Sequence, residues 1–367
     1  MRTLKSFRYI LSQKIVFITK SARQAYRELF PVIQHQASLL DVGLKILIHG
    51  TSDLEQVEGF DHVFLMNRSF VPLPDDLRFL RNLKSKNRFV YWFDQTDSSG
   101  TTNFEVIPFV DLYLKRAILG DLALYRYRYY RDRIFSDFYH SKFGVEDEAP
   151  FWTKQLLPKE HENKVRLCWN EVFTDHRQLG KFLHFFTRRF HPLLFWKCGY
   201  SVLPFEERGI DVFARMSSSH PANTISFQRK TILKHLKSFK FLENKQVEME
   251  GKIPPAVYQE QLEHSKVVVS PFGWGELCYR DVQAFRVGAA LLKPDVSHLR
   301  TWPDVLSGNH IPISWDFSDL EEKLEYLLDS PQECKEMATR GHESLMKYHG
   351  EQGKIAFVQH FKNLLLS

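Results

Sequence analysis

The sequence lacks the segments and ligand patterns that would place it in several large classes of protein. Its four cysteines lie far apart with no Cys-x-x-Cys pair, which favours free thiols in a reducing compartment and argues against a zinc site. No apolar run approaches the ~20 residues that span a bilayer. Basic residues interrupt the first apolar stretches, so no signal peptide is expected. Internal repeats, low-complexity tracts and the Rossmann and Walker glycine spacings are also absent.

The composition is that of a soluble folded chain with more than one domain. A length of 367 residues suits two domains of about 150 to 200 residues each. The hydrophobic share of 43% and charged share of 26% are ordinary for globular proteins. The net charge of +6 is compatible with an anionic substrate or membrane surface but is too small to indicate nucleic acid. We therefore expect a cytoplasmic protein with no nucleic-acid partner.

The N-terminal segment allows two interpretations. Its first acidic residue is Glu28, which follows seven basic residues with apolar residues at helical spacing among them. Such a segment can lie on anionic lipid, where each basic residue contributes about 1 kcal/mol. The protein would then be peripheral on the inner face of the plasma membrane. In the other interpretation, residues 14–19 form the first strand and the charges are solvated.

Strand and helix patterns alternate in both halves of the chain, which predicts an α/β fold with parallel sheets. Strands are expected over residues 44–48, 62–66, 89–93, 110–114, 165–169, 210–214, 247–249, 267–269, 291–294 and 311–313. Helices are expected over residues 21–40, 75–86, 224–238, 255–264, 319–328 and 351–366. We interpret this as two Rossmann-like αβα domains (1–175 and 206–345) that face a central cleft. A helical linker (176–205) joins them, and a C-terminal helix (346–367) packs back on the first domain.

The most informative stretch is a glycine loop after a buried strand. Three valines predict a parallel strand over residues 267–269, and Gly273, Trp274 and Gly275 follow in a loop where the backbone can approach a ligand closely. A helix is expected from Glu276 onward. Open α/β sheets bind phosphate at this position, with free backbone N–H groups at the start of the helix.

The helix after this loop carries three polar residues on one face. Glu276, Arg280 and Gln283 stand at i, i+4 and i+7. Because the planar guanidinium of Arg280 can make two parallel hydrogen bonds to a phosphate, its position next to the loop favours a ligand role over a merely amphipathic helix. For Glu276 the alternative is an acidic side chain favoured by the helix dipole.

The same stretch carries a family resemblance. Residues 270–276, 279–281, 283–284, Gly288 and 293–295 resemble the C-terminal domain of GT-B glycosyltransferases, especially bacterial envelope-polysaccharide, CgeB-like and exostosin-like enzymes. The likeness covers residues 250–345, with a weaker match to an acceptor domain over 91–115. It implies a nucleotide-sugar site in which Glu276 and Arg280 face sugar and phosphate. The glutamate that would bind ribose in the family is Gln283 here, and an amide binds a hydroxyl more weakly.

The resemblance implies transfer of a sugar from a nucleotide-sugar donor to a glycan or lipid-linked acceptor in envelope polysaccharide or lipopolysaccharide synthesis. A non-catalytic nucleotide- or glycan-binding protein that keeps the GT-B frame is the alternative. No metal or other cofactor is expected, because Asp94 and Asp97 do not form a compact Asp-x-Asp and no histidine pair has ligand spacing. The sugar, nucleotide, acceptor and stereochemical outcome are left open.

Further site residues are expected at the ends of strands. Asp94 and Asp97 follow a predicted strand, and either can be the base for an acceptor hydroxyl; the alternative is an Asx turn with a strand-end cap. Arg215, at the end of a strand, can reach phosphate or form an ion pair. Lys293 and His298 flank the strand after the motif helix and are expected near the donor, although a lone histidine is more often packed. Arg229 and Lys230 are expected to be solvated.

Overall fold

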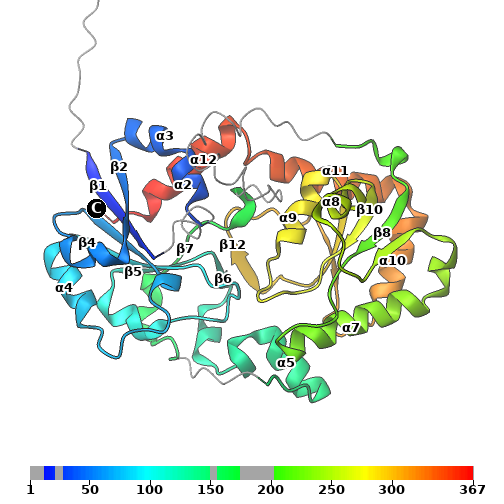
Figure 1. Ribbon diagram of the computed structural model, residues 1–367, viewed down its shortest axis with the longest axis horizontal. Coiled ribbons are helices and arrows are strands. Elements are labelled where there is room, and N and C mark those ends of the chain that lie inside the picture. The colour runs from blue at the N-terminus through cyan, green and yellow to red at the C-terminus, as the bar shows by residue number, and fades with distance from the viewer. Residues whose placement is uncertain (1–11, 21–27, 149–154, 174–201, 367) are drawn as a thin grey trace, which may run out of the picture.

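The computed structural model describes residues 12–20, 28–148, 155–173 and 202–366 of the chain. The basic stretch before Gln13 and most of the predicted linker (176–205) lie outside these residues. Within them, two parallel sheets with helices on their faces stand side by side (Figure 1). We refer to the six-stranded sheet and its helices as the first unit, and to the five-stranded sheet and its helices as the second unit.

The first unit has the strand order β2-β1-β3-β4-β5-β7, and every neighbouring pair is parallel. Its strands are β1 (Gln13–Thr19), β2 (Leu44–Gly50), β3 (His62–Met66), β4 (Phe89–Asp94), β5 (Leu112–Lys115) and β7 (Val165–Leu167). Residues 14–19 are therefore part of a strand, as one of the two interpretations expected. Because alternate side chains point to opposite faces, Phe17 lies in one core of this unit and Val16 in the other.

Helices cover both faces of the first sheet, which explains why an inner strand such as β3 is buried along its whole length. One face is covered by α2 (Phe30–Gln34), α3 (Gln36–Asp41) and α12 (Glu351–Leu364), and the other by α4 (Arg78–Lys86). Phe361 of α12 lies 6.0 Å from Phe64, ring centre to ring centre. The C-terminal helix thus returns to the first unit, as the sequence predicted (Figure 1).

The second unit has the strand order β13-β11-β10-β8-β9, again with parallel neighbours. Its strands are β8 (Ile210–Ala214), β9 (Val247–Met249), β10 (Ser265–Val269), β11 (Ala290–Pro294) and β13 (Ile311–Ile313). Its helices are α7 (Asn223–Ser238), α8 (Pro255–Glu263), α9 (Tyr279–Val287), α10 (Leu320–Asp329) and α11 (Pro331–Met346). Two αβα units with a returning last helix confirm the predicted α/β, GT-B-like fold class.

Two further elements tie the units together. Strand β6 (Ala117–Leu119) pairs antiparallel with β12 (Leu299–Thr301) between the units. Helix α5 (Ile134–Phe143) follows β6 in the chain but packs into the core of the second unit, where the ring of Phe135 lies 4.9 Å from that of Phe272. The sequence predicted neither contact, because β6 and β12 are three residues long and α5 lies in the first half of the chain.

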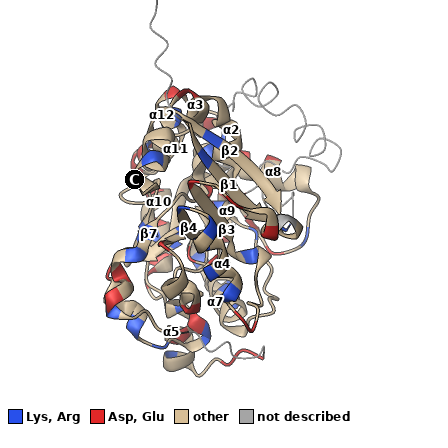
Figure 2. Cartoon of the chain, turned by 90° about the vertical axis from the view of Figure 1, so that its left-hand side faces the viewer, with Lys and Arg blue, Asp and Glu red and all other residues tan. Residues whose placement is uncertain are grey.

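None of the helices in the described part of the chain is long and apolar enough to cross a bilayer. Basic and acidic positions are interspersed over the side of the molecule shown in Figure 2. What distinguishes the candidate site is therefore a local cluster of charge rather than the overall sign.

Candidate functional site

The glycine loop lies at the carboxyl end of β10, beside β8. In the second sheet β9 lies on one side of β8, and β10, the next strand along the chain, lies on the other side. The order of the strands therefore reverses between β8 and β10. Ligands bind to open parallel sheets at such switch points. Gln228 of α7 fixes the start of the loop, because its side chain donates to the carbonyl of Phe272 (3.2 Å) and accepts from the N–H of Phe272 (3.0 Å).

The helix after the loop begins at Tyr279, so the prediction that it starts at Glu276 is wrong by three residues. Cys278 is the N-cap, and the carboxylate of Asp281 accepts from its backbone N–H (2.8 Å). Lys293 is fully buried and pairs with that carboxylate at 2.8 Å. Lys293 therefore stabilises the Asp281 carboxylate that caps the helix after the loop, whereas it was expected beside the donor.

Glu276 joins the loop to the first unit. Its carboxylate is 1% exposed and accepts from the Ser98 hydroxyl (3.1 Å), the Ser99 hydroxyl (2.8 Å) and the Ser99 N–H (2.9 Å). Gly275 touches the same segment so closely that a Cβ atom there would lie 1.8 Å from the carbonyl oxygen of Asp97. Glu276 therefore links the two units through these hydrogen bonds, and its carboxylate does not face a free space where a sugar could lie.

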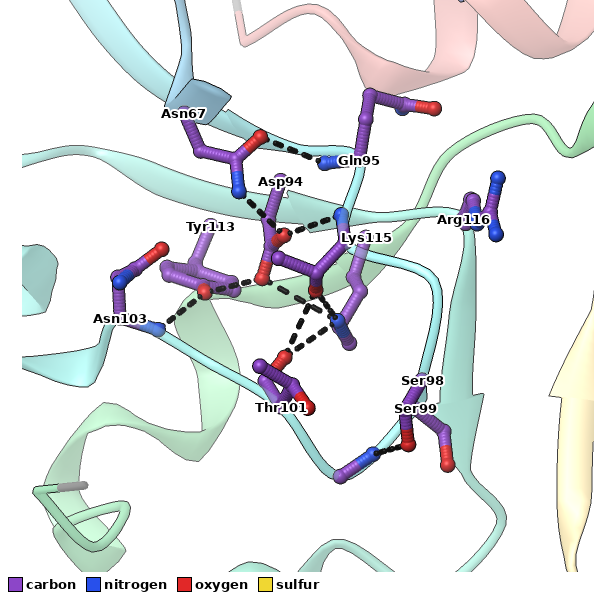
Figure 3. A network of polar contacts seen from close by, with 12 residues as sticks. Asn67, Asp94, Gln95, Ser98, Ser99, Thr101, Asn103, Tyr113, Lys115 and Arg116 are labelled. Carbon is purple, nitrogen blue, oxygen red and sulfur yellow. Dashed lines mark hydrogen bonds and ion pairs between the residues drawn. The ribbon is translucent and has the colours of Figure 1, made fainter. Parts of the chain in front are cut away.

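Asp94 is at the centre of a buried polar network (Figure 3). Its carboxylate accepts from the Asn67 amide (3.0 Å) and the Thr96 N–H (2.8 Å) on one oxygen, and from the Tyr113 hydroxyl and Lys115 ammonium (3.2 Å) on the other. Lys115 is opposite Asp94 in the β4–β5 register. Burial lowers the pKa of Lys115, against the opposing attraction of Asp94. The Asp94 carboxylate is thus fully buried, and each of its oxygens already accepts two hydrogen bonds.

The network also shapes the loop that reaches the second unit. The Lys115 ammonium donates to the Thr96 hydroxyl (2.6 Å) and the Thr101 carbonyl (2.7 Å), on either side of the Ser98–Ser99 turn (Figure 3). The buried ion pair therefore fixes the loop that binds Glu276.

Asp97, the other predicted base, is held between two arginines. Its Oδ1 accepts from Arg68 and from Arg116, each at 2.9 Å, while its side chain is 38% exposed. Although burial alone would lower the pKa of Arg116, Glu171 and Asp97 raise it overall. Both predicted bases thus have cationic partners, and neither is a free carboxylate.

Two arginines with few partners lie beside a pocket at the carboxyl end of β8. Arg280 of α9 donates to the carbonyl of Arg215 (2.8 Å), and Arg229 of α7 donates to the carbonyl of Ser217 (3.3 Å). Among the described residues neither pairs with a carboxylate, and the Nε of each is buried without a hydrogen-bond partner. Burial and the nearby Arg280 lower the pKa of Arg229. Arg229 was expected to be solvated and is partly buried, whereas Lys230 is exposed as expected.

The pocket beside these arginines has a volume of about 530 Å³ and combines charged, hydroxyl and apolar groups. It is lined by Arg215, Met216, Ser217, Ser218, Glu250, Gly251, Lys252, Ile253, Tyr258 and Arg280. Gln283 lies next to it, since its side-chain oxygen is 3.5 Å from the Tyr258 hydroxyl.

Arg215 has its side chain committed to the protein. Its guanidinium donates to Gln261 (3.0 Å), to the carbonyls of Met249 (3.2 Å) and Glu250, and to the Glu248 carboxylate. It therefore holds the loop after β9 against α8, as an ion pair would, and presents its carbonyl rather than its charge to Arg280.

Trp274 projects from the glycine loop and is 44% exposed. The ring of His220 contacts it at 4.6 Å, and the guanidinium of Arg133 lies over it at 5.1 Å from the ring centre. Burial, together with Arg229 and Arg133, lowers the pKa of His220 to about 4. His220 is therefore neutral at pH 7.

His298 is half-buried, beyond β11. Its ring contacts Trp315 at 5.3 Å, and its Nε2 has no hydrogen-bond partner among the described residues. Burial lowers its pKa, against the opposing effects of Glu276 and Asp295. His298 is thus near Glu276 at the junction of the units.

The structure brings together Gly273, Trp274, Gly275 and Arg280 at one edge of the second sheet, with Gln283 on the rim of the pocket. Arg229, His220 and Arg133 were not predicted as site residues. Only the fold places them together, because residues 133 and 280 are far apart in sequence. Among the described residues, no group of three or more His, Cys, Asp or Glu side chains is arranged to hold a metal.

No protein-family model matches the sequence, and no curated protein matches it either. Solved structures that resemble it include an alpha-glucosyltransferase in complex with UDP and a 13-mer DNA (10% identity, TM-score 0.44, covering 96% of this chain and 99% of that one). Others are Anabaena Alr3699/HepE in complex with UDP (8%, 0.44, 96% and 99%) and TarM (11%, 0.44, 83% and 55%). At these identities and TM-scores the likeness is distant.

The prediction that nucleic acid is not a partner is corrected by these structures. The matched alpha-glucosyltransferase was solved with DNA as well as UDP or UDP-glucose. That prediction relied on the net charge of +6, which averages over the chain and does not report local clusters of charge.

Proposed function

We propose that the chain is a glycosyltransferase that uses a nucleoside-diphosphate sugar, whose diphosphate lies against Arg229 and Arg280 beside the glycine loop. The observation that supports this most is the pair of arginines at a switch point, each with a single backbone acceptor and a buried, unpaired Nε. Guanidinium groups with spare donors bind phosphate through charge-assisted hydrogen bonds. The adjoining pocket of about 530 Å³ is large enough for a nucleoside.

The same arginines would serve catalysis. When the bond between the sugar and the diphosphate breaks, negative charge builds on the leaving phosphate oxygen. Two partly buried guanidinium groups, each held by a backbone carbonyl, would stabilise that charge with little reorganisation. Arg280 is one of the predicted donor residues, and Arg229 is added to it here. Gln283 and Tyr258 would meet the ribose or base.

Neither Asp94 nor Asp97 is proposed as the base, since both carboxylates are engaged. Instead, the leaving phosphate oxygen would take the proton of the acceptor hydroxyl as that hydroxyl bonds to the sugar on the face that the phosphate leaves. This course retains the configuration of the sugar. Inversion, seen by NMR of the product, would show that a protein base acts after all.

We further propose a glycan or lipid-linked acceptor of the bacterial envelope, and a cytoplasmic protein with its basic N-terminus at the membrane surface. The support is the family resemblance and the charge pattern of the first residues. No metal is proposed, because the arginines would supply the positive charge that a metal supplies in other transferases.

Calorimetric titration with a panel of nucleoside diphosphates tests the donor site. Arg280→Ala and Arg229→Ala should each weaken the binding of the preferred nucleotide about 10- to 100-fold, as expected for lost hydrogen bonds to a charged group. Lys230→Ala is the matched control, since Lys230 is exposed beside Arg229 on the same helix. If nucleotide affinity is unchanged in both arginine variants, the donor site lies elsewhere.

A non-catalytic nucleotide- or glycan-binding protein is the second candidate, and the Gln283 departure from the family pattern favours it. Such a protein would bind nucleotide in the titration above but would neither transfer nor hydrolyse any sugar of a nucleotide-sugar panel. Turnover of one donor excludes it.

A further inference from the structure

Arg133 is an arginine without an acceptor. Its guanidinium makes no hydrogen bond or ion pair with any residue that the structure describes, and its Nε is buried. Among the described residues, it lies over the ring of Trp274, 5.1 Å from the ring centre. A buried donor without an acceptor costs free energy, so an anion bound here would complete the hydrogen bonding of this guanidinium.

The neighbouring carboxylates do not fill that role, because each has other partners. Arg133 is close enough to Glu276, Asp147 and Asp97 to be attracted by them, although burial lowers its pKa overall. Their hydrogen-bond and ion-pair partners are Ser98 and Ser99 for Glu276, Thr224 and Arg131 for Asp147, and Arg68 and Arg116 for Asp97.

The backbone before Arg133 is strained in a way that directs it to the junction of the units. Arg131 and Asp132 have φ of 56° and 54°, a region that costs non-glycine residues roughly 1–2 kcal/mol each. The turn is held because the Asp132 carbonyl packs on Gly100, where a Cβ atom would lie 2.4 Å from it. Such strain is typical of functional sites.

Arg133 is separate from the arginines assigned to the diphosphate. Arg229 and Arg280 donate to the carbonyls of Ser217 and Arg215, after β8, whereas Arg133 is the N-cap residue of α5 and its guanidinium lies over Trp274. Trp274 contacts both the ring of His220 (4.6 Å) and the guanidinium of Arg133 (5.1 Å). One diphosphate at Arg229 and Arg280 therefore leaves Arg133 unoccupied.

We propose that Arg133 selects an acceptor that carries a negatively charged group, a carboxylate or a phosphate, next to the sugar that is extended. This rests on the proposed function, in which the diphosphate occupies the other arginines. Arg133 is on the acceptor side because its turn packs against Gly100 in the first unit. Trp274 positions the guanidinium through the contact with its ring face.

The test is calorimetry of the full chain with three sugars: glucuronate, glucose 6-phosphate and glucose. The wild type should bind at least one of the two anionic sugars at least tenfold more tightly than glucose, and the tighter of the two identifies the anion. Arg133→Gln should remove the preference while leaving nucleoside-diphosphate affinity unchanged, and Arg133→Lys should keep part of it. Arg229→Ala should show the reverse, with nucleotide affinity lost and the preference retained.

Equal affinity of the wild type for the three sugars would overturn the proposal. So would a loss of nucleotide affinity in Arg133→Gln as large as that in Arg229→Ala, because Arg133 would then belong to the diphosphate site. The sugar titrations need no nucleotide. A wild type that prefers anionic sugars but binds no nucleotide would therefore contradict the proposed function and not the role of Arg133.

Discussion

Substitution of Gly275 separates a packing role of the glycine loop from a ligand role. Gly273 and Gly275 both have φ outside the left-handed region, so alanine suits the backbone at either position and any effect is steric. A Cβ at Gly275 would lie 1.8 Å from the Asp97 carbonyl oxygen and 2.2 Å from its carbon. At Gly273 the nearest atom is the Cys278 sulfur at 3.3 Å, a side chain that can move.

The magnitude follows from these distances. Carbon and oxygen need about 3.3 Å, so Gly275→Ala must push two backbone segments apart by roughly 1.5 Å. Overpacking costs about 1–3 kcal/mol, and backbone atoms cannot rotate away, so we expect the upper end. Withdrawal of Asp97 also strains the hydrogen bonds of Ser98 and Ser99 to Glu276. We expect Gly275→Ala to lose about 3 kcal/mol or more, and Gly273→Ala less than about 1 kcal/mol.

The assay is urea unfolding together with Tm, which should fall by about 6–12 °C for 3 kcal/mol if each kilocalorie shifts it by about 2–4 °C. Nucleotide titration of the folded variants shows whether the loop also binds ligand. If both variants are as stable as the wild type to within 0.5 kcal/mol, the close contact between Gly275 and Asp97 does not exist in solution.

Three further predictions concern the supports of the site. Asp94→Asn should cost about 3–5 kcal/mol of unfolding free energy, because it leaves Lys115 buried without its counter-charge. The Asp97 side chain is 38% exposed, so Asp97→Asn should cost less than about 1 kcal/mol and keep transfer activity within a few-fold. If urea unfolding shows a larger loss for Asp97→Asn than for Asp94→Asn, this reasoning is refuted. Burial lowers the pKa of His62 to about 4, so the unfolded chain binds more protons than the folded chain between pH 6.5 and 4. This contribution to the free energy of unfolding is complete above pH 6.5 and is lost as the pH falls toward 4. Urea titrations from pH 7 to 4 should show a flatter slope for His62→Phe, and an identical slope would contradict the assignment. Phe361→Ala should cost about 3–5 kcal/mol by removing the contact of α12 with Phe64, and a smaller loss than 1 kcal/mol would mean that α12 is not docked on the first unit.

The sheets could be predicted because inner strands such as β3 and β10 are buried on both faces and carry apolar runs. Residues 62–66 and 210–214 are strands over the predicted ranges. The start of α9 was missed, because the pattern does not show that Cys278 and Asp281 form the cap. Strands β6 and β12 are too short to have a pattern of their own.

Side-chain roles were harder to predict than elements. Glu276 and Lys293 were expected at the donor. Glu276 instead accepts hydrogen bonds from Ser98 and Ser99, and Lys293 forms a buried ion pair with Asp281. A carboxylate that binds a sugar and one that accepts from serines are identical in sequence. The distinction lies in residues up to 178 positions away, which only the packing of the two units brings together.

The most direct measurement is a crystal structure of the protein with a nucleoside diphosphate. The phosphates should lie within hydrogen-bond distance of Arg229 and Arg280, next to Gly273, with the nucleoside in the pocket lined by Tyr258 and Lys252. Phosphates bound away from both arginines, or a pocket that stays empty at saturating nucleotide, would contradict the donor site.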